Sequence, residues 1–213
     1  MDMNCYIDHT ILKADALEAD IVRLCAEAKR YGFYSVCVNS GRVPLAVREL
    51  KDCAVKVCAV VGFPLGAMSC ATKVFEAKTA VEQGADEIDM VINVGFLKDG
   101  LYKEIEEEIG AIKTAIGSAV LKVIIETCYL TDDEKRKACE LAVAAGADFV
   151  KTSTGFGTGG ATFEDVQLML DTVNGKAKVK ASGGVRDAQT AQKYIGMGVM
   201  RLGTSNGIKI VEG

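Results

Sequence analysis

The sequence predicts an α/β fold of the (β/α)8 class, the TIM barrel, from three observations. Short runs of β-branched residues alternate with longer amphipathic stretches along all 213 residues. Eight such runs occur, which is the number of parallel strands that closes this barrel. Only two prolines and no low-complexity segment are present, so we expect one domain over residues 1–213. The alternative is an open doubly wound sheet, but a nucleotide-binding sheet of that kind needs G-x-G-x-x-G after its first strand, and residues 7–12 lack it.

Each strand candidate is a short apolar run that ends near a glycine, an asparagine or a hydroxyl residue. In chain order the candidates are Cys5–Thr10, Tyr34–Asn39, Lys56–Val61, Glu87–Asn93, Leu121–Glu126, Asp148–Thr152, Lys178–Ser182 and Met200–Gly203. Because both faces of a barrel strand are buried, these runs are expected to be apolar at nearly every position.

The helix candidates show apolar residues at a spacing of three and four. They are Asp15–Tyr31, Gly41–Leu50, Ser69–Gln83, Leu101–Ile116, Asp132–Ala145, Thr162–Asn174 and Asp187–Ile195, with a short helical tail after Asn206. Thr131 and Glu134 form a capping box, and Thr162 with Asp165 forms a weaker one. Glycines follow five of these stretches, where a left-handed residue ends a helix: Gly32, Gly84, Gly117, Gly146 and Gly175.

Charge and composition indicate a cytoplasmic protein with a small ligand. The net charge is −4 and no basic tract occurs, which argues against a nucleic-acid or anionic-membrane partner. No apolar run reaches the roughly 18 residues of a membrane span, and residues 1–10 do not resemble a signal peptide. The eight cysteines include no C-x-x-C pair, so we expect them to be reduced and to pack as small apolar residues.

The single histidine, His9, limits the chemistry. Catalytic zinc sites usually use two or three imidazoles, so a metal site is not expected, and no other cofactor is expected either. A Ser-His-Asp triad would require His9 as the base, and no G-x-S-x-G elbow precedes a helix.

Charged residues interrupt the strand candidates, where only the barrel interior or a strand end can accept them. They are Asp8, Asp89, Lys122, Glu126, Lys151 and Lys180. Lys151 and Lys180 belong to consecutive strands, whose backbones lie ~4.8 Å apart. If both face the interior at one level, like charge and burial disfavour protonation, and the pKa of one amine falls from about 10.4 toward ~7. A neutral lysine can form an imine, and the sequence thus predicts covalent catalysis assisted by a second lysine and Asp89.

Glycine and hydroxyl residues follow each of the last three strand candidates. The segments are 153–155, 182–184 and 203–205, with the sequences STG, SGG and GTS. Backbone N–H groups in such loops bind anions, and the late loops of this barrel often hold phosphate. A phosphorylated substrate is therefore expected.

The strand candidates and the loops that follow them together resemble the deoxyribose-phosphate aldolase family of class I aldolases. The matching segments are IDHTIL at 7–12, VCV at 36–38, VVGFPLG at 60–66, EIDMVINVG at 87–95, LKVIIETCYL at 121–130, AGADFVKTSTGF at 145–156, VKASGGVR at 179–186 and RLGTS at 201–205. They extend over nearly the whole chain, and the pair KTSTG and KASGG is specific to this family.

The resemblance implies reversible cleavage of 2-deoxy-D-ribose 5-phosphate into D-glyceraldehyde 3-phosphate and acetaldehyde. Lys151 is similar to the lysine that forms the Schiff base, Lys180 to the lysine that lowers its pKa, and Asp89 to the acid/base residue that works through water. Asp8 and Thr10 match supporting residues in the barrel interior. The positions that match phosphate-binding residues are Gly155, Gly183, Gly184, Gly203 and Ser205.

Two departures from the family pattern concern the substrate phosphate and the tail. Phe156 occupies a position where some relatives have a lysine that supplements phosphate binding, and residues 208–213 lack the tyrosine that closes the tail in some members. Whether Cys37 reacts with aldehydes stays open, with packing as its default role.

Two other functions are compatible with a lysine-bearing barrel. One is a different Schiff-base aldolase, transaldolase-like or acting on keto acids, although neither predicts both lysine motifs together with EIDMVIN. The other is a noncatalytic phosphosugar-binding barrel, which has no reason to bury two neighbouring ammonium groups. A homo-oligomer is expected, with a dimer preferred.

Overall fold

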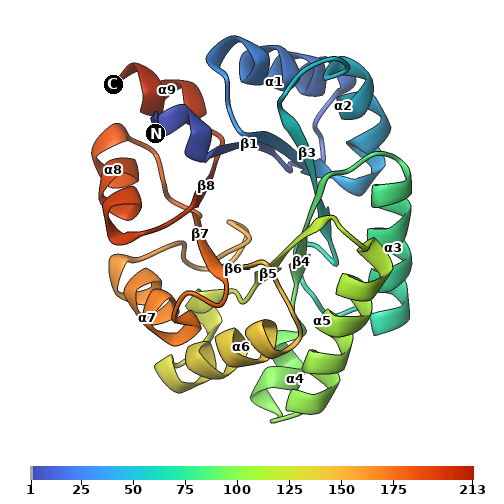
Figure 1. The fold of residues 1–213 in the computed structure, drawn as a ribbon, viewed down its shortest axis with the longest axis vertical. Helices are drawn as coiled ribbons and strands as arrows, with labels where there is room; N and C mark the ends of the chain where they lie inside the picture. Colours follow the sequence, from blue (N-terminus) through green and yellow to red (C-terminus); the bar gives the residue numbers. More distant parts are fainter. Residues whose placement is uncertain (1) are drawn as a thin grey trace.

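Eight parallel strands form a closed barrel, and helices surround it on the outside (Figure 1). The computed structural model describes residues 2–213. The strands are β1 (Ile7–Ile11), β2 (Ser35–Asn39), β3 (Lys56–Val61), β4 (Glu87–Val91), β5 (Val120–Ile124), β6 (Phe149–Lys151), β7 (Lys178–Ser182) and β8 (Arg201–Thr204). Each strand pairs with the next, and β8 pairs with β1. The predicted (β/α)8 barrel is confirmed.

Helices follow each strand, and the last of them, α9, comes after β8. They are α1 (Glu18–Tyr31), α2 (Val43–Glu49), α3 (Cys70–Glu82), α4 (Val94–Lys98), α5 (Tyr102–Ile116), α6 (Asp132–Ala144), α7 (Phe163–Val173), α8 (Ala188–Met197) and α9 (Gly207–Glu212). Three short 3-10 helices, η1 (Met3–Tyr6), η2 (Ser40–Arg42) and η3 (Thr127–Tyr129), complete the chain. No helix within residues 2–213 has both the length and the apolar character needed to cross a membrane.

The local signals predicted from sequence determine several helix ends. The Thr131 hydroxyl accepts the Glu134 N–H and the Glu134 carboxylate accepts the Thr131 N–H, so this capping box is confirmed. All five helix-ending glycines have positive φ, from +59° at Gly117 to +105° at Gly84. In the weaker pattern Thr162 accepts the Asp165 N–H, which caps α7.

Some predicted boundaries were wrong because short helices replace strand or helix ends. The first strand begins at Ile7 rather than Cys5, since residues 3–6 form η1. The helix predicted from Gly41 starts as η2, and α2 begins at Val43 with Pro44 in its first turn, where a missing N–H costs nothing. Helix α4 was not predicted; Asn93 caps it by accepting the Phe96 N–H.

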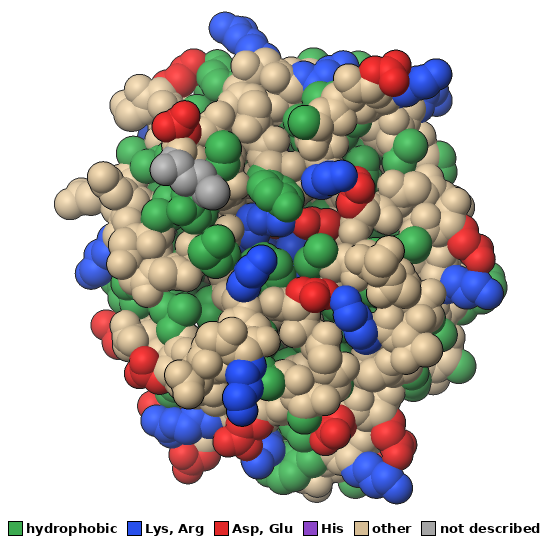
Figure 2. Space-filling view, viewed as in Figure 1, with side chains coloured by type: hydrophobic (Ala, Val, Ile, Leu, Met, Phe, Trp, Pro, Cys, Tyr) green, Lys and Arg blue, Asp and Glu red, His purple; other side chains and the backbone are tan. Residues whose placement is uncertain are grey.

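The core consists of an apolar shell and a mixed interior. Most buried apolar side chains form one continuous cluster between the strands and the helices. A smaller cluster of Leu12, Cys37, Cys58 and Val60 packs with Phe63 apart from that shell. Charged side chains gather in the hollow at the centre of the molecule (Figure 2). This charged interior contains the residues that the sequence analysis singled out.

Candidate active site

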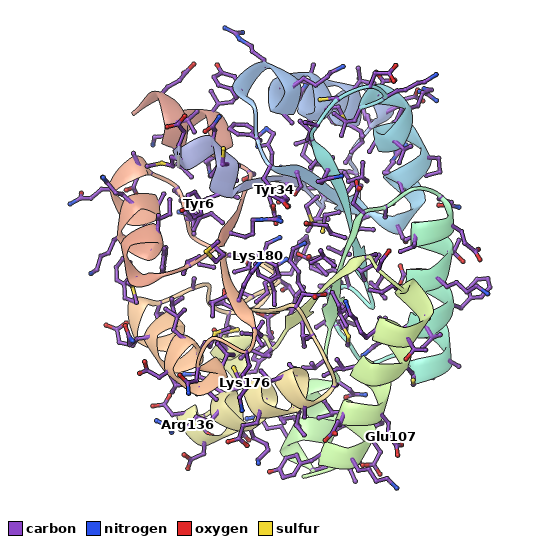
Figure 3. All side chains as sticks on the ribbon, viewed as in Figure 1. Tyr6, Tyr34, Glu107, Arg136, Lys176 and Lys180 are labelled. Atoms are coloured by element: carbon purple, nitrogen blue, oxygen red, sulfur yellow. The ribbon has the colours of Figure 1, made fainter. Side chains whose placement is uncertain are left out.

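Lys151 and Lys180 lie side by side in the barrel interior. The two residues lie opposite one another where β6 pairs with β7. Lys151 is 3% exposed and Lys180 is 0% exposed. In Figure 3 the Lys180 label lies within the ring of strands. The predicted placement of both lysines at one level of the interior is therefore correct.

Asp89 on β4 joins the two lysines. Its Oδ2 atom accepts hydrogen bonds from Lys151 Nζ and from Lys180 Nζ, each at 2.8 Å. The two nitrogens are therefore at most twice that distance apart. Its other oxygen, Oδ1, accepts from Lys122 Nζ at 2.8 Å. A single buried carboxylate thus contacts three ammonium groups.

A second set of contacts closes this group into a ring. Lys122 also pairs with Glu87, at 2.6 Å, and Glu87 pairs with Arg201 at 2.8 Å. Arg201 then reaches Asp8 at 2.8 Å. Asp8 accepts a hydrogen bond from Lys180, which returns the chain of contacts to Asp89.

Lys151 differs from the other cations of this ring in two respects. Within residues 2–213, Lys122, Lys180 and Arg201 each contact two carboxylates, whereas Lys151 contacts Asp89 alone. Of these four cations only Lys151 lines the large cavity at the barrel mouth. The lysine that can meet a ligand is also the one with the fewest compensating charges.

The pKa shifts follow from this arrangement. Burial alone would raise the pKa of Asp89, but Lys122, Lys151 and Lys180 together hold it well below its usual value. Burial alone would lower the pKa of Lys180, yet Asp8 and Asp89 raise it above its usual value. The expected repulsion between two amines is thus outweighed at Lys180 by Asp8 and Asp89, whose effect on the pKa of Lys180 the sequence analysis did not include. If one of the two amines is neutral, it is not Lys180.

The cavity lies at the ends of β6, β7, β8 and β1 and has a volume of about 1290 Å³. All five predicted phosphate-binding residues line it, together with Lys151 and Thr10. They are Gly155, Gly183, Gly184, Gly203 and Ser205. The structure therefore brings these loop residues and one of the two lysines to a single space.

Two of these glycines are required by close approaches. Gly183 has φ +81°, and a Cβ there would lie 2.9 Å from the Gly160 Cα of the preceding loop. A Cβ at Gly203 would lie 3.1 Å from Lys180 Cε. Larger residues at either position would displace a loop or the lysine side chain.

The two predicted supporting residues have different roles in the structure. Asp8 is fully buried and holds Lys180, Arg201 and the Ser35 hydroxyl. Thr10 lies at the cavity and donates its hydroxyl to the Asp8 carbonyl oxygen. Asp8 thus belongs to the charged ring and Thr10 to the cavity wall.

Comparison with known proteins agrees with this geometry. A protein-family model described as DeoC/LacD family aldolase matches residues 3–209. The chain belongs to this aldolase family. A deoxyribose-phosphate aldolase from Finegoldia magna is 61% identical over all of both chains, and one from Carboxydothermus hydrogenoformans is 62% identical over 97% of this chain and 92% of its own. The solved tetrameric deoxyribose phosphate aldolase from Aeropyrum pernix is 33% identical, with a TM-score of 0.90 over 99% of this chain and 89% of its own.

Three residues of this aldolase that matter to the site were not given a role by the sequence analysis. Glu87 and Arg201 close the charged ring, and Glu126 binds the loop after β6. Glu87 lies two positions before Asp89 on one strand, so both face the interior. This two-residue spacing could have predicted from sequence that Glu87 faces the interior together with Asp89. Lys122 was noticed as a charge within a strand, but its partners were not predicted.

One group of side chains in the aldolase has the composition of a metal site. The ligand atoms of Cys37, Cys58 and Asp89 lie within 4.8 Å of one another, and all three residues are buried. Both Asp89 oxygens are already hydrogen-bonded to ammonium groups, so a metal would have to displace them. The expectation of a metal-free mechanism stays a prediction.

Cys37 is fully buried and does not line the cavity, which supports packing as its role in the aldolase. A hydrogen bond with Cys58 lowers the pKa of its thiol and outweighs the effect of burial.

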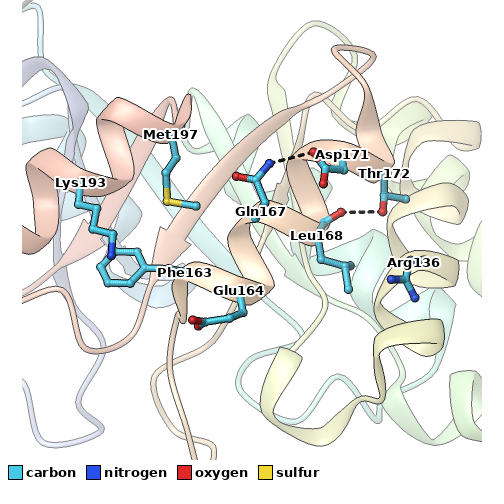
Figure 4. A pocket seen from close by; sticks show the side chains of 9 residues that line it. All are labelled: Arg136, Phe163, Glu164, Gln167, Leu168, Asp171, Thr172, Lys193 and Met197. Atoms are coloured by element: carbon cyan, nitrogen blue, oxygen red, sulfur yellow. Dashed lines mark hydrogen bonds between the residues drawn. The ribbon is translucent and has the colours of Figure 1, made fainter.

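A second hollow, of about 700 Å³, lies on the outside of the barrel around α7 (Figure 4). Arg136, Phe163, Lys193 and Met197 are among its lining residues. None of the predicted site residues lies there.

Proposed function

We propose that this protein is a deoxyribose-phosphate aldolase that cleaves 2-deoxy-D-ribose 5-phosphate reversibly through a Schiff base on Lys151. The single observation that carries this proposal is the position of Lys151, at the cavity and with only one carboxylate partner. The 61% and 62% identical relatives that bear this enzyme's name support it over a transaldolase-like or keto-acid enzyme. The same relatives argue against a noncatalytic sugar-binding barrel.

The contacts within the ring support Lys151 as the nucleophile. The four cations of the ring face three carboxylates, so full ionisation leaves one uncompensated positive charge in a buried site. An uncompensated buried charge is costly, and loss of one proton removes it. Lys180 contacts two carboxylates and has a raised pKa, which leaves Lys151 as the nucleophile.

The proposed reaction uses this amine and the adjacent acid groups. Lys151 Nζ adds to the C1 aldehyde carbon of the open-chain sugar, and loss of water gives an iminium. The C2–C3 bond then breaks, its electrons form an enamine, and the C3 hydroxyl proton passes through water to Asp89. D-Glyceraldehyde 3-phosphate leaves. Protonation of the enamine carbon and hydrolysis then release acetaldehyde and free Lys151, with Lys180 as the neighbouring proton donor.

Reductive trapping tests the proposal directly. The protein is incubated with acetaldehyde, reduced with borohydride and digested, and the adduct is located by mass spectrometry. We expect one adduct, at Lys151. Labelling at another lysine, or no labelling, would rule the proposal out. Prior dialysis against EDTA should not change turnover, and inactivation would implicate a metal.

The role proposed for Lys180 predicts a shift in the pH dependence of imine formation. Lys180→Leu removes a positive charge that shares Asp89 Oδ2 with Lys151, so imine formation should require a higher pH. We expect the midpoint of imine formation to rise by about 1 pH unit or more, from the Coulomb energy of two charges a few Å apart. The measurement is the rate of borohydride-trapped adduct between pH 5 and 10. An unchanged profile would remove Lys180 from the activation of Lys151.

The cavity loops are proposed to hold the substrate phosphate. Gly155, Gly183, Gly184, Gly203 and Ser205 offer backbone N–H groups and a hydroxyl at one end of the cavity. Phe156 lies beside them, 54% exposed, with its ring edge-on to Phe63 at 5.3 Å between centroids. An apolar ring there contributes no charge to phosphate binding.

Phe156→Lys is therefore expected to strengthen binding of the phosphorylated substrate. An added charge at the exposed cavity mouth contributes about 1 kcal/mol, so KM for 2-deoxyribose 5-phosphate should fall about fivefold. KM for unphosphorylated 2-deoxyribose should not change, and Phe156→Leu serves as the uncharged control. An equal fall for both sugars would show that the phosphate does not lie near residue 156.

The organisation of the protein is proposed as follows. Residues 1–213 form a single domain that works in the cytoplasm without a bound cofactor. It acts on small phosphorylated sugars and aldehydes. A homodimer is proposed because Leu65 and Phe75 are each 73% exposed, and buried apolar surface drives association. Light scattering coupled to gel filtration would determine the number of subunits.

A further inference from the structure

The loop after β6, residues 152–162, is long and carries three residues of the cavity wall. Thr154, Gly155 and Phe156 line the cavity, and the loop continues to the start of α7 at Phe163. The C-terminal end of this loop is hydrogen-bonded to the loop after β7, since the Ala161 N–H donates to the carbonyl oxygens of Ser182 and Gly183. The N-terminal part of the loop, residues 154–156, is held by a side chain instead.

Glu126, two residues after the end of β5, binds residues 154–156 of this loop. Its carboxylate accepts the backbone N–H of Thr154, at 3.2 and 3.3 Å for the two oxygens, and also accepts the Thr154 hydroxyl. The same hydroxyl oxygen accepts the Phe156 N–H at 3.0 Å. One carboxylate therefore fixes the backbone on both sides of Gly155.

The environment of this carboxylate is unusual. Glu126 is 3% exposed, and among residues 2–213 no cation lies within salt-bridge distance of it. Its partners are neutral N–H, O–H and S–H groups, the last from Cys128 at 3.9 Å. Burial of a carboxylate without a cation is costly, so the residue is expected to serve a purpose other than stability.

The backbone conformation at Glu126 also indicates a functional role for this residue. Its φ is +55°, in the left-handed region. The other two non-glycine residues with positive φ in the described chain are Asp52 and Asn174, whose side-chain types adopt this conformation readily. A glutamate there is strained, and such strain concentrates at functional sites. From this backbone conformation the Glu126 carboxylate contacts the loop at Thr154.

Two glycines of the loop pack onto the same residues. A Cβ at Gly157 would lie 2.8 Å from Cys128 Sγ and 3.3 Å from Glu126 Cδ, and a Cβ at Gly159 would lie 3.1 Å from Cys128 Cβ. The loop thus crosses directly over the Glu126 side chain. Glu126 itself does not line the cavity.

We propose that Glu126 is a positioning residue that holds the 154–156 segment in the conformation that binds the substrate phosphate. The inference rests on the proposed function. Glu126 should affect the affinity for phosphate, because its carboxylate contacts Thr154, the residue next to Gly155. It should not affect the chemistry at Lys151, because the Glu126 side chain does not contact the charged ring. The residue acts through the loop and does not touch the substrate.

The test compares Glu126→Gln with Glu76→Gln. Glu76 is the matched control because its carboxylate likewise accepts one backbone N–H, from Gly62, and one hydroxyl, from Ser40, in loops after other strands. We expect Glu126→Gln to raise KM for 2-deoxyribose 5-phosphate about tenfold, which corresponds to about 1.4 kcal/mol. The amide replaces one acceptor oxygen with an NH₂ donor and removes the negative charge, so the contacts with the Thr154 N–H and hydroxyl are weakened. Glu76→Gln should leave KM within twofold.

Four further readouts separate positioning from general damage. Unphosphorylated 2-deoxyribose should be turned over equally by Glu126→Gln and the parent enzyme, and the acetaldehyde adduct at Lys151 should form at the same rate. Thr154→Val interrupts the same contact from the loop side, and combining it with Glu126→Gln should give less than the sum of the two effects. Thr154→Ser, which keeps the hydroxyl, should restore KM.

The outcomes distinguish this inference from the proposed function. A parent enzyme that gives no adduct at Lys151 would overturn the proposed function. A parent enzyme that does give it, with KM unchanged in Glu126→Gln or raised equally for both sugars, would overturn the role of Glu126 alone. If Glu126→Gln does not fold, Thr154→Val decides the question by the same KM comparison.

Discussion

Lys151→Leu is expected to abolish aldolase activity, with kcat reduced by at least about 10⁴-fold. Covalent catalysis divides a difficult bond cleavage into easier steps, and no other amine in the described chain both lies in the charged ring and lines the cavity. Leucine approximates the length of the lysine stem without the amine. The measurement is the initial rate of 2-deoxyribose 5-phosphate cleavage, together with loss of the borohydride-trapped adduct.

Lys73→Leu is the matched control for this variant. Lys73 is another fully buried lysine, and burial lowers its pKa despite its ion pair with Glu108 at 2.6 Å. It lies on α3 and does not line the cavity. We expect Lys73→Leu to lose thermal stability while the adduct at Lys151 still forms. Residual aldolase turnover in Lys151→Leu near that of the parent enzyme would contradict the assignment of the nucleophile.

Asp89→Asn is expected to damage both stability and catalysis. The substitution removes the anion that Lys122, Lys151 and Lys180 share within residues 2–213, and leaves three buried lysine side chains short of a partner. Breaking a buried ion pair by removing one partner costs about 3–5 kcal/mol. Loss of the group that takes the C3 hydroxyl proton should lower kcat by about 10²- to 10⁴-fold. Urea denaturation and steady-state kinetics measure the two effects separately.

The stability loss in Asp89→Asn should depend on pH. The folded-state pKa of Asp89 lies well below its ordinary value of 3.8, so its charge stabilises the fold fully above about pH 4. That contribution is lost as the pH falls through the lower folded-state pKa. The difference in unfolding free energy between parent and variant should therefore be constant at neutral pH and shrink under strong acid.

Asp86→Asn provides the comparison for Asp89→Asn. Asp86 also accepts from a lysine, Lys56, at 3.0 Å, and from the Val57 N–H, but its side chain is 38% exposed. An exposed pair of this kind is worth at most about 1 kcal/mol. Equal losses of stability in the two variants would show that the ring around Asp89 is not a special source of stability.

The barrel could be predicted from sequence because its signals are local. The eight strand runs and the five glycines of positive φ are encoded within a few residues of each position. Charged residues in buried strands also predicted the site, since a barrel interior is the only place that accepts them. Helix α4 was missed because five residues are too few to show the periodic pattern of a helix.

The electrostatics of the site could not be predicted to the same extent. Arg201 and Asp8 are 193 positions apart in the chain, and closure of β8 onto β1 brings them to 2.8 Å. Coulomb energies change steeply over a few Å, so the sign of a pKa shift depends on which partners the closed barrel supplies. This is why the raised pKa of Lys180 was not foreseen.

The sequence by itself determined that this chain is a (β/α)8 barrel with Lys151, Lys180 and Asp89 directed to its interior, because the two-residue period of a strand assigns each side chain to a face. Only the tertiary structure decided how those charges are shared. Strand register and barrel closure place two carboxylates beside Lys180 and one beside Lys151. That difference in compensation, set by distances across the barrel, is the reason for proposing Lys151 as the nucleophile.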